Sequence, residues 1–197
     1  MQAKSNKLGG RLWFNIILFG FMGQIAWSVE NMYFNTFLYN SVYNGASQNA
    51  VNGSLDVMSA ISAMVAFSAA TAVITTFFAG TLSDKTGKRK WFISIGYILW
   101  GIVTASFGLI SRDNTAALFG LTDEVKILTV TVCLVIVMDC VMTFMGSTGN
   151  DAAFNAWVTD VTNTKNRATV ESVLALMPLL ATAVVMGLAG AVTGIGY

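Results

Sequence analysis

The chain has 197 residues, of which 55% are hydrophobic and 11% charged, with a net charge of +1. A soluble domain carries roughly 25% charged residues, so this composition excludes a soluble monomer and predicts a protein whose solvent is lipid. The absence of histidine removes the commonest general base and metal ligand. Cys133 and Cys140 are seven residues apart in one apolar run. On a helix they are about 10.5 Å apart, too far for a disulfide, so they leave the redox compartment open.

Five apolar segments approach or exceed the roughly 20 residues that a helix needs to cross a bilayer. The first follows the basic residues Lys4, Lys7 and Arg11, as in a signal peptide, but it is too long for one and no small-residue cleavage site closes it. The sequence therefore predicts an all-α membrane protein with a retained first span and about five transmembrane helices. We expect the spans at about 12–40, 56–79, 91–110, 127–157 and 170–193.

Basic residues are divided unevenly between the two sets of loops. Nine of the eleven lie in segments 1–11, 80–90 and 159–169, and only Arg112 and Lys126 lie in the opposite loops. Because clustered Lys and Arg hold short loops on the cytoplasmic side, we expect the N-terminus inside and the C-terminus outside. The expected location is the plasma membrane.

Polar side chains form a stripe along the first span, at spacings that place them on one face of a helix. Such a face cannot point at lipid without cost, so it faces either a cavity or a neighbouring helix to which its amides merely bond. Glu30 lies one residue round the helix from this stripe. Inserting an ionisable residue at membrane depth costs at least about 2.5–3.5 kcal/mol of free energy. We therefore expect a cavity lined by the stripe and bordered by Glu30. The stripe consists of Gln24, Trp27, Ser28, Asn31 and Asn35.

The second span is instead crowded with small residues, which let helix backbones approach closely and predict tight packing in the bundle. Asp56, at its outer end, is expected to cap the helix at the membrane interface. The small residues include Ala66, Ala69, Ala70, Ala72 and Ala79.

The fourth span is polar over much of its inner half. Asp139 lies near its middle and begins one helical stripe, and Asp151 lies further in on an adjacent stripe. A helix that only packs in a core would not be built this way, so we expect it to form the wall of a water-filled pathway. The first stripe is Asp139, Thr143, Gly146 and Asn150, and the second is Ser147, Asp151 and Asn155.

The sequence offers little support for an enzyme. It has no histidine and no cysteine pair at metal-ligand spacing, and Gly146-Ser147-Thr148-Gly149 is too short for a P-loop and lacks its lysine. Intramembrane acids, amides and an indole suit the reversible binding of a polar solute with a cation or proton, because a carboxylate can neutralise either. We expect a transporter with no cofactor and no nucleic-acid partner, coupled to Na⁺ or H⁺.

The segment Gly80–Lys90 carries a motif. Its order, Gly-x-x-x-Asp-(Arg/Lys)-x-Gly-(Arg/Lys)-(Arg/Lys), resembles the loop between the second and third helices of the major facilitator superfamily. The resemblance implies the N-terminal bundle of an alternating-access transporter, in which this acid helps to latch two halves together. The next inner segment, from Asp160 to Arg167, is similar to the family's acid-then-arginine arrangement, so Asp84 and Arg167 are expected in one cytoplasmic charge network. The matching positions are Gly80, Asp84, Lys85, Gly87, Lys88 and Arg89.

Within that superfamily, the chain looks most like the glycoside–pentoside–hexuronide:cation symporters, the melibiose-carrier group. The segment Phe19-Gly20-x-x-Gly23 resembles the group's opening, and Asp151–Thr159 resembles the end of its fourth helix. The resemblance implies that Asp151 is a sugar-binding acid, with Asn155 where an aromatic residue would stand and Trp157 displaced by two.

One position departs from that group. The melibiose carriers place two cation-binding acids four residues apart on the second helix, where this chain has Ala72 and Thr76. The coupling role is therefore expected to have passed to Glu30 or Asp139, with a proton as a candidate coupling ion.

Together these patterns predict five of the six helices of one half of a secondary transporter, as a piece of a longer protein whose other half is absent from this sequence. The expected substrate is a sugar or glycoside. Two alternatives stay open: an exporter of other organic solutes with the same fold, and a membrane assembly subunit that transports nothing. The expected substrate site comprises Gln24, Trp27, Asn31, Asn150, Asp151 and Asn155, and the coupling site comprises Glu30 and Asp139.

Overall fold

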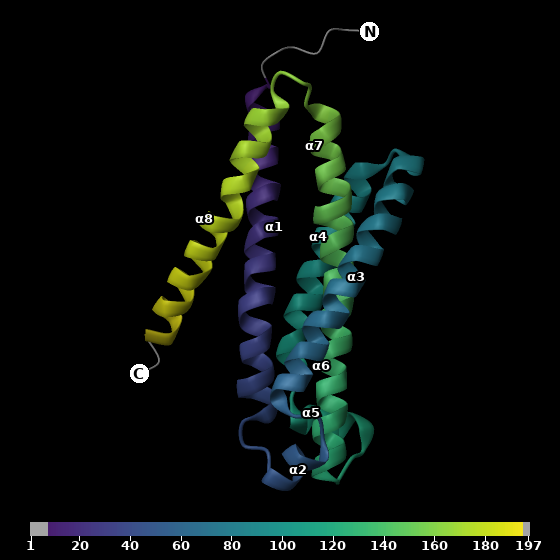
Figure 1. Cartoon of the computed structure of the whole chain (residues 1–197), viewed down its shortest axis with the longest axis vertical. Coiled ribbons are helices and arrows are strands. Elements are labelled where there is room, and N and C mark those ends of the chain that lie inside the picture. The colour runs from purple at the N-terminus through teal and green to yellow at the C-terminus, as the bar shows by residue number, and fades with distance from the viewer. Residues whose placement is uncertain (1–7, 195–197) are drawn as a thin grey trace.

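The computed structural model describes residues 8–194, with side chains as far as Leu188, and in that range it is built of helices without strands (Figure 1). Within this part of the chain, five helical stretches are long and apolar enough to cross a membrane, as the sequence predicts. Lys4, Lys7 and the C-terminal Tyr197, on which part of the expected orientation rests, lie outside the described residues.

Several of the stretches combine more than one kind of helix. The first comprises α1 (Gly10–Phe37) and the π-helical η1 (Leu38–Tyr43), the second is α3 (Val57–Thr86), and the third comprises α4 (Arg89–Ser106) and the 3₁₀ turn η2 (Phe107–Leu109). The fourth comprises α6 (Glu124–Gly146), the π-helical η3 (Ser147–Phe154) and α7 (Asn155–Val161), and the fifth is α8 (Arg167–Gly194). Two short helices that the sequence did not predict, α2 (Gln48–Gly53) and α5 (Arg112–Phe119), lie in the connections between the first and second spans and between the third and fourth.

The spans run alternately up and down (Figure 1). α1 and α8 pack side by side, while α3 and α4 both pack against the α6–η3–α7 stretch. The start of α1, the α3–α4 turn and the α7–α8 connection all lie at one end, drawn at the top, and α2 and α5 lie at the other. The basic segments therefore share one end of the bundle, and their cytoplasmic location remains a prediction.

Two clusters of buried apolar side chains hold the spans together. The larger joins α1, α3, α4 and α6, where the rings of Phe34 and Phe107 stack with centroids 4.1 Å apart. The smaller lies towards the basic end and joins α1, α4, η3, α7 and α8 through residues such as Ile16 and Val158. Large apolar side chains also cover the outside of the bundle; Val73, for example, is 72% exposed. A surface of this kind fits contact with lipid.

The connection between the second and third spans is shorter than the sequence predicts. α3 continues to Thr86, and Gly87 ends it in the left-handed conformation, with φ of +63°, before α4 begins at Arg89. Only Gly87 and Lys88 separate the two helices, so the expected loop over 80–90 is wrong in its extent. The apolar pattern marks where a helix leaves lipid, whereas the helix itself continues in water until a glycine stops it.

Side-chain caps begin the helices at the opposite end. The carboxylate of Asp56 accepts hydrogen bonds from the backbone amides of Met58 and Ser59, both at 3.1 Å, which confirms the expected helix cap. Hydrogen bonds from Ser59 and Met58 lower the pKa of Asp56 below its ordinary value, so the cap stays ionised. Ser47, Ser111 and Asp123 cap α2, α5 and α6 in the same way.

Close backbone packing occurs at glycines of the third and fourth spans. A Cβ atom added to Gly96 of α4 would lie 2.8 Å from the Cα atom of Gly149 in η3. The prediction of tight packing for the alanines of the second span is wrong for Ala66, Ala69 and Ala70, which are exposed, whereas Ala79 is buried. Small residues mark a close contact only where they face a neighbour, and composition alone does not give the facing direction.

We predict that Gly96→Ala destabilises the fold by about 1–3 kcal/mol, because its methyl group would meet backbone that cannot move aside. Gly101 lies on the same helix with nothing within 4 Å of its added Cβ. Gly101→Ala should be neutral or stabilising and serves as the matched control. Thermal unfolding of both variants in detergent, followed by size-exclusion chromatography, measures the difference. Equal midpoints for the two variants would contradict the prediction.

Candidate functional site

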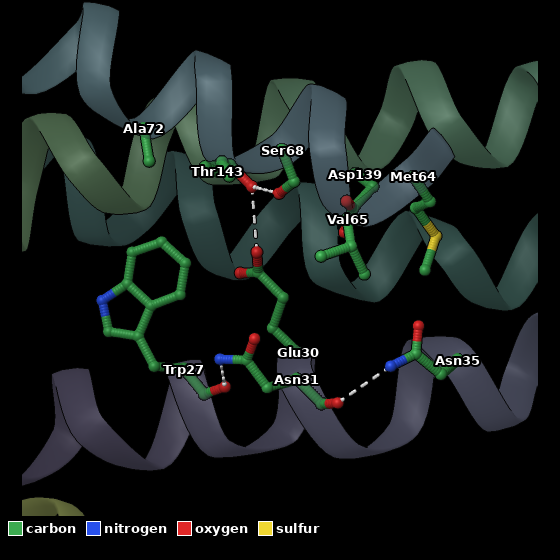
Figure 2. Close-up of a pocket in the computed structure, with 11 residues that line it drawn as sticks. Trp27, Glu30, Asn31, Asn35, Met64, Val65, Ser68, Ala72, Asp139 and Thr143 are labelled. Carbon is green, nitrogen blue, oxygen red and sulfur yellow. Dashed lines mark hydrogen bonds between the residues drawn. The ribbon is translucent and has the colours of Figure 1, made fainter. Parts of the chain in front are cut away.

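A cavity of about 230 Å³ lies between α1, α3 and α6 (Figure 2). A cavity of this volume can hold several water molecules. The walls combine carboxyl, hydroxyl, amide and indole groups with small and apolar side chains. The lining residues are Trp27, Glu30, Asn31, Asn35, Met64, Val65, Ser68, Ala69, Ala72, Asp139 and Thr143.

Glu30 reaches across the cavity from α1 to the opposite wall (Figure 2). Its side chain is only 7% exposed, and its Oε1 atom accepts a hydrogen bond of 2.9 Å from the hydroxyl of Thr143. That hydroxyl also contacts the hydroxyl of Ser68 on α3, at 2.5 Å. The second carboxyl oxygen of Glu30 is buried and has no hydrogen-bond partner among the described residues.

Asp139 brings a second carboxyl group to the same cavity. It is 3% exposed on α6, one turn before Thr143, and it interacts electrostatically with Glu30. The hydroxyl of Ser68 lies close enough to interact with its carboxyl group. No Lys or Arg is among the residues that line the cavity. Two carboxyl groups therefore share a buried space without a cation to balance them.

The α1 side of the cavity carries amides and an indole. Asn31 donates from Nδ2 to the backbone oxygen of Trp27 at 2.8 Å, and Asn35 donates to that of Asn31 at 3.3 Å. These bonds hold both amides against their own helix, which leaves Asn35 Oδ1 buried without a partner among the described residues. The indole of Trp27 packs edge-on against Trp100, with ring centroids 5.1 Å apart.

A second polar cluster lies further along the fourth span, where η3 meets α1 and α4. The hydroxyl of Tyr97 lies 2.8 Å from Oδ1 of Asn150, and the amide of Asn150 donates to Asp151 at 3.0 Å. Gly23 makes this approach possible, since a Cβ atom there would lie 2.3 Å from Asn150 Oδ1. Asp151 also interacts with Trp27, so the indole lies between the two polar clusters.

The predicted site residues divide into two groups. The structure brings Trp27, Glu30, Asn31 and Asp139 together around one cavity, from two spans that are far apart in the sequence. Asn150 and Asp151 lie in the second cluster and do not line that cavity. Gln24 is half-buried outside the cavity lining, and Asn155 is exposed and bonds to the backbone oxygen of Asp151.

The predicted face of the fourth span is interrupted. Asp139 and Thr143 share a face as expected, but Gly146 packs against the ring of Trp100 and Asn150 faces Tyr97. The fourth stretch becomes π-helical from Ser147, which changes the angular spacing of the residues that follow. Most of this segment is buried by its neighbours, and Asp139 and Thr143 are the residues of the fourth span that line this cavity. A water-filled pathway along the span remains a prediction.

One residue of the site and one of its contacts had no clear signal in the sequence. Ser68 lies in a run of small and apolar residues, and nothing in that run distinguishes it from Ser59 or Ser62. Thr143 was expected on the Asp139 stripe, but its bond to Glu30 depends on the approach of two distant spans. Ala72, where the melibiose carriers have an acid, lines the cavity, so this wall of α3 supplies no charge.

A separate charge network ties the helices at the basic end. Arg89, at the start of α4, forms an ion pair of 2.8 Å with Asp84 of α3 and a second pair with Asp160 of α7. Arg89 is thus the residue that joins the two acids. Arg167 ties the start of α8 to α7, donating to the Thr162 hydroxyl and the Thr159 carbonyl. Gly80 lies within α3, while Lys85 and Lys88 are exposed beside the network.

No family model, curated protein or solved structure matches this chain. Within the described residues, no group of three or more His, Cys, Asp or Glu side chains lies together as a metal site would require. The geometry of the cavity and the pattern of the sequence are therefore the observations that bear on function.

We predict that Ala69→Cys reacts with a charged, membrane-impermeant thiol reagent at least about tenfold faster than Ala70→Cys, because a thiolate forms only where water reaches it. Ala69 lines the cavity on α3, whereas its exposed neighbour Ala70 faces away from it. Both variants are made in a background without Cys133 and Cys140, the two native thiols. Equal labelling rates in proteoliposomes would show that the cavity is not accessible to water.

Proposed function

We propose that the protein is a secondary active transporter of the major facilitator type, which carries a polar organic solute with a proton or cation. The observation that carries this proposal is the polar cavity between three apolar spans. Burying an ionisable side chain at membrane depth costs free energy, so two such side chains that face one cavity are best explained by a functional role. The rest of the bundle meets lipid with apolar surface.

The depth of the cavity supports this mechanism. Glu30 and Asp139 lie near the middles of the helical stretches Gly10–Tyr43 and Glu124–Val161. Transporters that work by alternating access bind substrate and coupling ion near the middle of the bilayer, where gates on either side can close in turn. The proposed orientation, with the basic end in the cytoplasm and the protein in the plasma membrane, follows the division of Lys and Arg.

A sugar or glycoside is the proposed solute. The indole of Trp27 stands on one side of the cavity and the carboxyl groups on the other (Figure 2). An indole can pack on the apolar face of a sugar ring, while carboxyl and amide oxygens accept hydrogen bonds from its hydroxyls. The likeness to the melibiose-carrier group points in the same direction. Export of another organic solute is the second candidate, favoured by the uncharged α3 wall at Ala72.

We predict that Glu30→Gln and Asp139→Asn each abolish gradient-driven accumulation of the solute, because each removes one of the two buried groups that can bind a cation or proton. Glu171 is an exposed acid on α8, and Glu171→Gln is the control that should leave accumulation unchanged. The measurement is uptake of labelled glycosides by the full-length natural protein in proteoliposomes, with and without imposed ion gradients. Full accumulation by both cavity variants would refute the coupling role.

The network at the basic end supplies a second test. We predict that Arg89→Gln lowers the transport rate at least about tenfold, because it removes the cation that joins Asp84 of α3 to Asp160 of α7. Lys90, the next residue, has no ion pair among the described residues, so Lys90→Gln should behave as wild type. Initial uptake rates, normalised to protein in the membrane, give the comparison. Indistinguishable rates for the two variants would show that the Arg89 charge network has no role in the transport cycle.

A further inference from the structure

Four polar side chains from three spans lie close together across the cavity. Hydrogen-bond contacts join Glu30 on α1 to Thr143 on α6, and Thr143 to Ser68 on α3 (Figure 2). The carboxyl group of Asp139, one turn from Thr143, interacts with the Ser68 hydroxyl at the end of this chain. A carboxyl group stands at each end, and the two hydroxyl groups lie between them. Glu30, Asp139 and Thr143 are all more than nine-tenths buried.

The number of protons in this chain limits the number of hydrogen bonds that its members can form. Each hydroxyl group donates only one hydrogen bond, and an ionised carboxylate donates none. If both acids were ionised, the Ser68 hydroxyl could donate either to Thr143 or to Asp139. In the first case the Asp139 carboxylate receives no donor from this chain, and in the second the contact of 2.5 Å between the two hydroxyl oxygens holds no proton. One additional proton, on either acid, supplies a donor for every contact in the chain.

The electrostatic environment also favours that proton. Asp139 on α6 and Asp151 on η3 both interact electrostatically with Glu30, and Tyr97 of α4 faces Asp151. The α3 wall of the cavity holds no titratable group. No basic side chain lines the cavity. Two ionised carboxylates would therefore repel each other in a medium of low dielectric constant. The buried second oxygen of Glu30 also lacks a donor among the described residues.

We propose that Glu30 and Asp139 share one proton, which the hydroxyl groups of Thr143 and Ser68 pass between them. With the proton on Asp139, that acid donates to Ser68, Ser68 to Thr143 and Thr143 to Glu30. Transfer breaks the O–H bond at Asp139, Ser68 and Thr143 and forms one at Ser68, Thr143 and Glu30. The negative charge moves from Glu30 to Asp139, and no proton is gained or lost.

The relay makes the proton the coupling ion of the proposed transporter. Its use in transport rests on the proposed function. The relay moves a negative charge from α1 to α6 without moving a helix. A solute whose hydroxyl groups bind to the carboxylate would therefore favour one position of the proton. Release of the proton to either side then depends on which acid holds it when that side opens.

The first test compares Thr143→Val with Thr143→Ser. Valine keeps the shape of the side chain and lacks the hydroxyl group, so the relay is cut, whereas serine preserves it. We expect Thr143→Val to lose proton-driven accumulation by at least about tenfold and to retain exchange of labelled for unlabelled solute at equal pH, which needs no net proton movement. Thr143→Ser should resemble wild type in both assays. Wild-type accumulation by Thr143→Val, or failure of Thr143→Ser in the same way, would overturn the relay.

The second test needs no transport and so separates the relay from the proposed function. Infrared spectra of the purified protein at neutral pH should show the carbonyl band of a protonated carboxyl group. The band should vanish in Glu30→Gln/Asp139→Asn, persist in Asp151→Asn, and shift in Thr143→Val but not in Thr143→Ser. Absence of the band in wild type, or its loss when Na⁺ is added, would overturn the shared proton; the latter outcome would indicate a sodium site. A band that behaves as expected in a protein that transports no tested solute would leave the relay standing and refute the proposed function.

Discussion

The burial of two carboxyl groups in an apolar bundle is the constraint on which the rest of this structure depends. Glu30 and Asp139 cannot face lipid without a cost in free energy, and both line the cavity between α1, α3 and α6. The hydroxyl groups of Ser68 and Thr143 supply hydrogen bonds that lipid cannot. A chain of this kind holds three spans in fixed relative positions, because loss of any member leaves a buried polar atom without a partner.

The change of helix type in the fourth span lets one polypeptide segment serve two neighbours. Its α-helical part presents Asp139 and Thr143 to α1 and α3. Its π-helical part, from Ser147 to Phe154, turns Asn150 towards Tyr97 and Gly23 instead. A uniform α-helix would keep Asp139 and Asn150 on one stripe, facing the same side of the span.

Much of the fold could be predicted from the sequence because helices of membrane-spanning length can be recognised from their length and apolar composition. The five stretches, the cap at Asp56, and a polar cavity bordered by Glu30 follow from single segments read alone. The rest depends on contacts between segments. Neither the role of Ser68 nor the partnership of Asp84 with Arg89 and Asp160 leaves a trace in local spacing. The end of α3 was misjudged because hydropathy reports the lipid boundary, and a helix need not stop there.

The short turn at Gly87 and Lys88 has a mechanical consequence. With two residues between them, α3 and α4 have no slack at the basic end, and Arg89 fastens both to α7 through its two ion pairs. An axial displacement of α3 must therefore be transmitted to α4 and α7. The wall that carries Ser68 and Ala72 then moves as part of a stiff three-helix unit. A displacement of α3 caused by a change of charge inside the cavity can therefore be transmitted along the whole helix to its basic end.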